Sequence, residues 1–241
     1  MTVFRRIVLV AALAGLVAGA FETVAYRIGT AAIIAKAEVF EKAADKAQAA
    51  TGGSSTATDN SVAGMSHGSD AMAWEPREGF ERTALTVLSG ILKDVGFALL
   101  LAAAYALSGR DVDWRKGLYW GLAGFATFTL APGLGLPPEV PGTASAPLLD
   151  RQIWWVATAA ATGAGLAMLF LTKRAAWALA GVVLLVLPHV FGAPQPAEYK
   201  SAAPELLAHQ FVVAAVVTSL LFWSILGSLT GFLYQRFPAT T

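Results

Sequence analysis

The chain contains no cysteine and few charged residues. None of its 241 residues is cysteine, and only 14% are Asp, Glu, Lys or Arg, whereas a soluble domain carries about 25% charged residues. The lack of cysteine excludes disulfides, thiolate metal sites and cysteine nucleophiles. The formal net charge is only +1, so no basic or acidic excess favours binding to nucleic acid.

Two motifs with a defined chemistry are also missing. The sequence has no phosphate-binding Gly-x-x-x-x-Gly-Lys-Ser/Thr loop, so the chain is not expected to hydrolyse ATP itself. It has no His-Glu-x-x-His zinc motif either. We therefore predict a protein that is not an enzyme and that has no resident cofactor.

Apolar residues dominate what remains, at 56% of the chain. A membrane-spanning helix needs about 20 mainly apolar residues, and about six segments reach or approach that length. They are 7–24, 84–107, 117–130, 153–171, 175–190 and 211–233. Because the third and fifth are short, five spans are the alternative. The first could be a signal peptide, but it ends at Phe21-Glu22 without a small-residue cleavage site, so we expect an anchored helix.

Positive residues in the short loops predict the orientation. If the chain crosses the membrane about six times, most of them fall on one side: Arg5, Arg6, Arg110, Arg115, Lys116, Lys173, Arg174 and Arg236. Short loops rich in Lys and Arg face the cytoplasm. We therefore predict an all-α, polytopic membrane helix bundle, a single transmembrane domain over 1–241, with both termini cytoplasmic and the bacterial inner membrane as its location.

The opposite, periplasmic side carries longer connections. A long insertion spans 28–82, with a helical extension at 28–50 and a flexible linker at 51–72 that is rich in Gly, Ser and Thr. The two other outer loops, 131–152 and 188–209, contain several prolines. Because proline fixes φ, these two loops should be stiff.

Pairs of small residues at a spacing of four recur in the predicted spans. They are Gly15-x-x-x-Gly19, Gly117-x-x-x-Gly121 and Gly227-x-x-x-Gly231. Such pairs let membrane helices approach closely. They favour tight packing inside one subunit, with docking of a partner subunit as the alternative.

Ionisable residues inside a span are costly and therefore suggest a function. Lys93 and Asp94 lie near the middle of the second predicted span, and Glu22 lies at the outer end of the first. Adjacent helical side chains point about 100° apart, so we expect Lys93 and Asp94 to find partners on other helices rather than each other. One interpretation is a cation or proton path through Asp94, Lys93 and Glu22. The others are a structural ion pair between helices and, for Glu22, a merely interfacial position.

The outer ends of the last two spans suggest a metal site. His189 follows Pro188 at one helix end, and Glu205 and His209 fall four residues apart on the next helix. Glu139 and Asp150 belong to the same outer side. Carboxylates and imidazoles suit Co²⁺, Ni²⁺, Zn²⁺ or Mn²⁺. The alternatives are a hydrogen-bonded structural histidine and, for Glu205, an acid that complements the helix dipole.

Four stretches together give the chain a resemblance to a known family. They are the start from Phe4-Arg5-Arg6 to Phe21-Glu22, the run from Gly117 to Gly142, Arg151-Gln-Ile-Trp-Trp with Thr158, and Leu187-Pro-His with Gly192-Ala-Pro. In these the chain resembles the CbtA family of predicted cobalt transporter subunits. The resemblance implies cobalt uptake linked to cobalamin synthesis, and a small single-span partner, CbtB, with a histidine-rich end. It also extends the metal role to His189, Glu139 and Asp150, which lie within or beside the matching stretches.

The functional hypothesis is therefore a membrane transporter subunit for uptake of a divalent cation, with Co²⁺ as the transported ion. Its expected partners are the lipid bilayer, the small His-rich CbtB-type subunit and the metal ion, and a homo-oligomer stays open. One alternative is a non-transporting membrane scaffold or metal-docking subunit. Another is a membrane enzyme or lipid-binding protein.

Overall fold

The described part of the chain, residues 1–51 and 79–238 of a computed structural model, is built from helices. Within those ranges there is no strand, only an isolated bridge between Thr143 and Ser201. The elements are α1 (Val3–Gly29), α2 (Ala31–Thr51), α3 (Phe80–Ser108), α4 (Trp114–Phe125), the π-helix η1 (Ala126–Leu130), α5 (Ala131–Gly135), α6 (Leu148–Leu171), α7 (Ala175–Phe191) and α8 (Glu205–Arg236). The predicted linker at 51–72 lies almost entirely outside the described residues.

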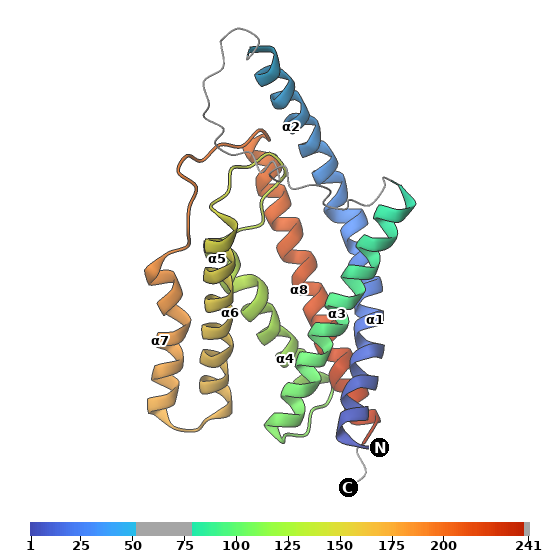
Figure 1. The fold of residues 1–241 in the computed structure, drawn as a ribbon. Helices are drawn as coiled ribbons and strands as arrows, with labels where there is room; N and C mark the ends of the chain where they lie inside the picture. The colour runs from blue at the N-terminus through green and yellow to red at the C-terminus, as the bar shows by residue number, and fades with distance from the viewer. Residues whose placement is uncertain (52–78, 239–241) are drawn as a thin grey trace.

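The helices pass back and forth along one axis. Four of them are long and apolar enough to cross a membrane, namely α1, α6, α8 and residues 83–108 of α3, and α7 is a shorter apolar helix. A further pass is made by α4, η1 and α5, which follow one another without a break. Both termini lie at the same end, and α2 continues α1 beyond the other end (Figure 1). The prediction of an all-α membrane helix bundle is confirmed.

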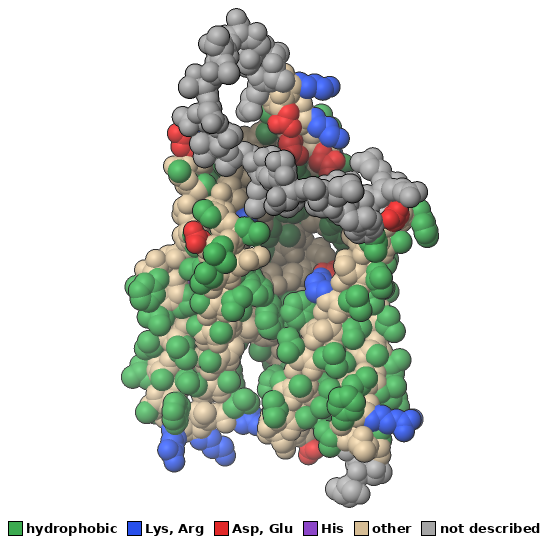
Figure 2. Space-filling model, viewed as in Figure 1, with side chains coloured by type: hydrophobic (Ala, Val, Ile, Leu, Met, Phe, Trp, Pro, Cys, Tyr) green, Lys and Arg blue, Asp and Glu red, His purple; other side chains and the backbone are tan. Residues whose placement is uncertain are grey.

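The surface matches this assignment. Large apolar side chains face outward along the bundle, among them Leu16, Val17, Leu92, Val183, Leu179 and Phe232, each at least 49% exposed. Figure 2 shows hydrophobic side chains over this face of the bundle, with Lys and Arg gathered at the end that holds both termini. Lipid tails would cover the apolar band, and the basic end fits the side predicted to be cytoplasmic.

Small residues set the closest helix contacts. A Cβ added to Gly227 in α8 would lie 2.6 Å from the Cα of Gly121 in α4, and one added to Gly117 would meet the Gly227 carbonyl oxygen. In the same way, a Cβ on Gly15 in α1 would lie 2.8 Å from the Val95 backbone nitrogen in α3. These glycines therefore pack helices of the same chain, which confirms the intrasubunit interpretation.

Aromatic side chains fill the centre beside these contacts. Trp223 of α8 stacks on Phe128 of η1 with ring centroids 5.6 Å apart and lies 4.9 Å from the ring of Phe97 in α3. Trp223 is only 2% exposed. The aromatic cluster joins α3, η1 and α8 in the middle of the bundle.

The π-helix η1 has a cause in the sequence. Pro132 has no backbone N–H, and in an α-helix its ring would collide with the carbonyl of Phe128, four residues earlier. A π-helical turn adds a residue and absorbs this mismatch. It also places the Thr129 hydroxyl 2.7 Å from that of Ser219 in α8.

The outer loops are shorter than the prolines suggested. We expected loops over 131–152 and 188–209, but α5 extends to Gly135, α6 begins at Leu148 and α8 begins at Glu205. Pro132 is tolerated because η1 precedes it. Pro188 lies inside α7 near its end, where Gly192 donates a backbone hydrogen bond to its carbonyl at 3.1 Å. At Pro132 and Pro188 the proline therefore lies within a helix and not in a loop. The loop boundaries that we predicted from the prolines were wrong.

Candidate functional site

The charged residues of the first two predicted spans meet between α1 and α3. Gly19 of α1 leaves the space that the Asp94 side chain of α3 occupies: a Cβ on Gly19 would lie 2.7 Å from the Asp94 Oδ2 atom. Asp94 is 1% exposed. The small residue on α1 therefore lets a carboxylate lie buried at the helix interface.

Lys93 lies between two carboxylates. Its Nζ atom donates to Oε1 and Oε2 of Glu22 at 2.9 and 2.8 Å and lies 3.2 Å from Oδ1 of Asp94. The partner on another helix was predicted correctly, but the expectation that Lys93 and Asp94 do not pair was wrong. The long lysine side chain bends back across the 100° that separates neighbouring positions, because its four methylene groups rotate freely.

Asp94 is incompletely satisfied. Its Oδ1 atom is buried and, among the described residues, accepts no hydrogen bond of good geometry, although the ammonium is 3.2 Å away. Removing a carboxylate from water costs several kcal/mol unless it is well paired. With Glu22 and Lys93 the cluster has a formal charge of −1, so it retains attraction for a further positive charge.

A third helix closes the site. The Phe222 ring of α8 lies 5.4 Å from Lys93 Nζ, within the range of a cation–π contact. Phe222 is 2% exposed. The position of the ammonium is thus bounded by α1, α3 and α8, with carboxylates on two sides and an aromatic face on the third.

A hollow of about 850 Å³ adjoins this cluster. It lies between α1, α3 and α8 in the half of the bundle away from the termini, where Figure 2 shows the surface hollowed. Hydroxyl-bearing residues make up much of its lining: Thr23, Tyr26, Thr30, Thr83, Thr86, Ser89, Thr218 and Ser219. Glu22 and Lys93 also line it, so the charged cluster is reached from this hollow.

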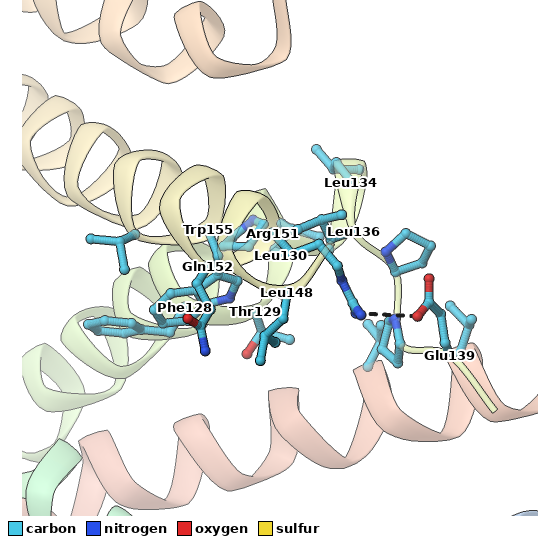
Figure 3. A pocket seen from close by; sticks show the side chains of 17 residues that line it. Phe128, Thr129, Leu130, Leu134, Leu136, Glu139, Leu148, Arg151, Gln152 and Trp155 are labelled. Carbon is cyan, nitrogen blue, oxygen red and sulfur yellow. Dashed lines mark ion pairs between the residues drawn. The ribbon is translucent and has the colours of Figure 1, made fainter. Parts of the chain in front are cut away.

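A second cavity, of about 590 Å³, lies near the outer ends of α5 and α6 (Figure 3). Its wall includes Glu139, which forms an ion pair with Arg151 at 3.2 Å and accepts a hydrogen bond from Ser145. Phe128 and Trp155 supply an aromatic part of the wall. The Glu139 carboxylate therefore already joins the loop after α5 to the start of α6.

The other predicted metal ligands lie in different environments. The His189 ring packs edge-on against Trp154 with centroids 6.0 Å apart. Asp150 is exposed in the first turn of α6, and Glu205 and His209 are exposed in the first turns of α8. Across residues 1–51 and 79–238, no three His, Asp or Glu side chains form a group that could hold a metal. The metal role of these residues remains a prediction.

The comparison with known families fits this picture of a charged site inside a membrane bundle. Residues 4–235 match the family described as probable cobalt transporter subunit (CbtA). The chain belongs to the CbtA family. No curated protein and no solved structure matches it. The chain is therefore a member of a family of probable membrane transporter subunits.

The CbtA structure also shows buried polar residues to which the sequence analysis assigned no polar role. Thr158 and Thr162 of α6 are 0% and 2% exposed, and neither side-chain oxygen has a hydrogen-bond partner among the described residues. The Nε1 atom of Trp154 is buried and unpaired as well. Thr158 and Thr162 are four residues apart, which places them on one face of a helix. This spacing is the sequence signal that could have identified them.

One further motif lies in the sequence between α2 and α3. Gly64-Met65-Ser66-His67-Gly68 has the Gly-x-Ser-x-Gly spacing of a hydrolase nucleophile turn. That turn requires a strand followed by a helix, and the Gly- and Ser-rich sequence around residues 64–68 has no strand pattern. The motif lies outside the described residues of this CbtA chain.

Proposed function

We propose that this CbtA chain is the membrane-embedded subunit of an uptake system for divalent cations, with Co²⁺ as its substrate. The observation that carries the proposal is the pair of carboxylates, Glu22 and Asp94, which flank a position inside the bundle at the base of a hydroxyl-lined hollow. Ionisable residues inside a membrane-spanning segment are rare and often mark an ion pathway, so they support a transport function.

The direction of movement follows from the charge pattern. With the basic end of the bundle cytoplasmic, in a bacterial inner membrane, the hollow opens toward the outside. The membrane potential, negative inside, contributes about 2.3 kcal/mol per charge per 100 mV to inward movement of a cation. The sequence contains no ATP-binding loop, so this potential is the driving force that we assign to the chain itself.

Selection of cobalt requires more than the carboxylates. Oxygen ligands alone suit Mg²⁺, Ca²⁺ and Mn²⁺ as well as Co²⁺, whereas imidazole favours the later transition metals. We assign the imidazole contribution to His189 and His209 at the outer side, together with Glu139, Asp150 and Glu205, and to a small single-span partner with a histidine-rich end. The description of the family as a subunit supports the existence of a partner.

The proposal is tested by cobalt accumulation in cells that lack other cobalt importers. The wild-type chain, with and without the candidate partner, is compared with Glu22→Gln at equal membrane levels. We expect Glu22→Gln to reduce uptake about tenfold or more, as for loss of an interaction worth about 1.4 kcal/mol or more. The matched control is Glu198→Gln, which removes a glutamate whose side chain is 71% exposed in an outer loop.

A second candidate function is a scaffold that docks a metal-carrying partner without passing the ion. It is favoured by the lack of a three-ligand metal group among the described residues. Uptake by the chain with its partner that is unaffected by Glu22→Gln would support this scaffold. Uptake by the chain alone would exclude it.

A further inference from the structure

The ammonium of Lys93 occupies a position that has the features of a cation site. Three carboxylate oxygens from two helices surround it at 2.8, 2.9 and 3.2 Å. One of these oxygens, Oδ1 of Asp94, belongs to a side chain that is 1% exposed and lacks a hydrogen bond of good geometry. The ammonium is therefore held mainly by Glu22, while Asp94 contributes a buried charge aimed at the same point.

We propose that the Lys93 ammonium is a resident occupant of a cation site formed by Glu22 and Asp94, and that a divalent cation binds there by displacing it into the adjoining hollow. The inference deepens the proposed function and rests on it for the identity of the cation. It assigns to Lys93 the role of a tethered competitor, which neutralises part of the carboxylate charge when no metal is bound.

Charge balance supports an exchange. When both are ionised, the carboxylates of Glu22 and Asp94 carry a formal charge of −2, and the ammonium reduces this to −1. A divalent ion between the carboxylates neutralises them completely, and it then repels the ammonium, because like charges in contact repel one another where water screens them poorly. The metal and the ammonium therefore do not share the site.

The structure provides room for the displaced side chain. The Lys93 side chain is 46% exposed and lines the hollow of about 850 Å³. Ser89, Thr218 and Ser219 line the same hollow, and their hydroxyl oxygens can accept hydrogen bonds from an ammonium. Asp94 cannot follow, because it fits into the space left by Gly19. Lysine moves and the aspartate stays.

Labelling of the wild-type protein tests the exchange directly. The purified full chain, with its partner where the complex is stable, is treated with an amine-acetylating reagent with and without CoCl₂ or MnCl₂. Mass spectrometry then gives the labelling of Lys93 relative to Lys36, an exposed residue of α2. We expect the metal to raise the Lys93-to-Lys36 ratio severalfold. A ratio that stays constant or falls with metal overturns the inference.

Substitution gives a second, independent readout. In Lys93→Met the competitor is gone, so CoCl₂ should raise the melting temperature more than it does in the wild type, whereas Lys93→Arg, which keeps the charge, should show no such gain. Adding Glu22→Gln to Lys93→Met should remove the gain. An equal metal response in all these proteins contradicts the proposal. If Lys93→Met does not fold, the wild-type labelling still decides.

The two proposals fail in different ways. Cellular cobalt uptake that depends on Glu22, combined with a constant Lys93 labelling ratio, would overturn the exchange and leave the transport function standing. Metal-dependent labelling of Lys93 without any uptake would support the exchange at a cation site of a protein that does not transport cobalt.

Discussion

The carboxylate of Asp94 lies in the space that a side chain at Gly19 would fill, 2.7 Å from the position of that Cβ. A glycine on α1 and an acid on α3 thus form one interface. The helix contact and the buried charge depend on each other, because a larger residue on α1 would push the carboxylate away from Lys93.

The first prediction concerns this interface. Gly19→Ala should disrupt the position of Asp94 and lower both stability and cobalt uptake. Overpacking of a close contact costs about 1–3 kcal/mol, which outweighs the gain of about 1 kcal/mol from replacing glycine by alanine in a helix. The matched control is Gly96→Ala in α3, where a Cβ would meet nothing within 4 Å. Equal thermal stability of the two variants would contradict the packing described here.

The second prediction concerns the contact between α4 and α8. Gly227→Ala places a methyl group 2.6 Å from the Cα of Gly121, a backbone atom that no side-chain rotation can move away. We expect a loss of about 3 kcal/mol or more, seen as a lower melting temperature or as aggregated protein in size-exclusion chromatography. Gly133→Ala, which meets nothing within 4 Å, is the control and should elute like the wild type.

The sequence predicted the fold better than it predicted the candidate site. The apolar segments, the basic loops and the glycine pairs are local signals, and they predicted the bundle and its internal packing. The proline positions misled about the loops, because the π-helical turn before Pro132 and the continuation of α7 through Pro188 were not visible in the pattern. To predict that Lys93 pairs with Glu22, one must know which helices are neighbours. The two residues belong to consecutive spans, and contact between consecutive spans is the simplest arrangement.

The outer metal ligands show the limit of spacing arguments. Glu205 and His209 are four residues apart, yet whether a third ligand joins them depends on how the loops fold, which no local pattern specifies. Glu139 illustrates the point, since Arg151 and Ser145 already engage its carboxylate. A charged side chain in a loop near a histidine can stabilise the loop through an ion pair as readily as it can bind a metal.

The third prediction addresses Glu139. If its main role is to join the loop to α6, Glu139→Gln and Arg151→Gln should each cost about 0.5 kcal/mol of stability, because the pair is partly exposed. The double variant should cost little more than either single one. Thermal unfolding of the three variants measures this coupling. Additive losses would show that the two residues act separately and would favour the metal role of Glu139.

The fourth prediction uses the unpaired hydroxyls of α6. Thr158→Val keeps the shape of the side chain and removes a buried oxygen without a partner, so stability should stay equal or rise by about 1 kcal/mol. Thr129→Val is the contrast, since it breaks the 2.7 Å hydrogen bond to Ser219 and should cost about 1 kcal/mol. A large destabilisation by Thr158→Val would show that its hydroxyl is bonded in the membrane, for example to water.

The central claim is that a divalent cation passes between Glu22 and Asp94. The most direct measurement is uptake of radioactive cobalt into proteoliposomes that hold the purified chain, with its partner if required, under an imposed inside-negative potential. The account predicts uptake by the wild type and by Asp45→Asn, an exposed position of α2, and loss of about tenfold or more in Asp94→Asn. Equal uptake by Asp94→Asn, at equal protein insertion, would contradict the account.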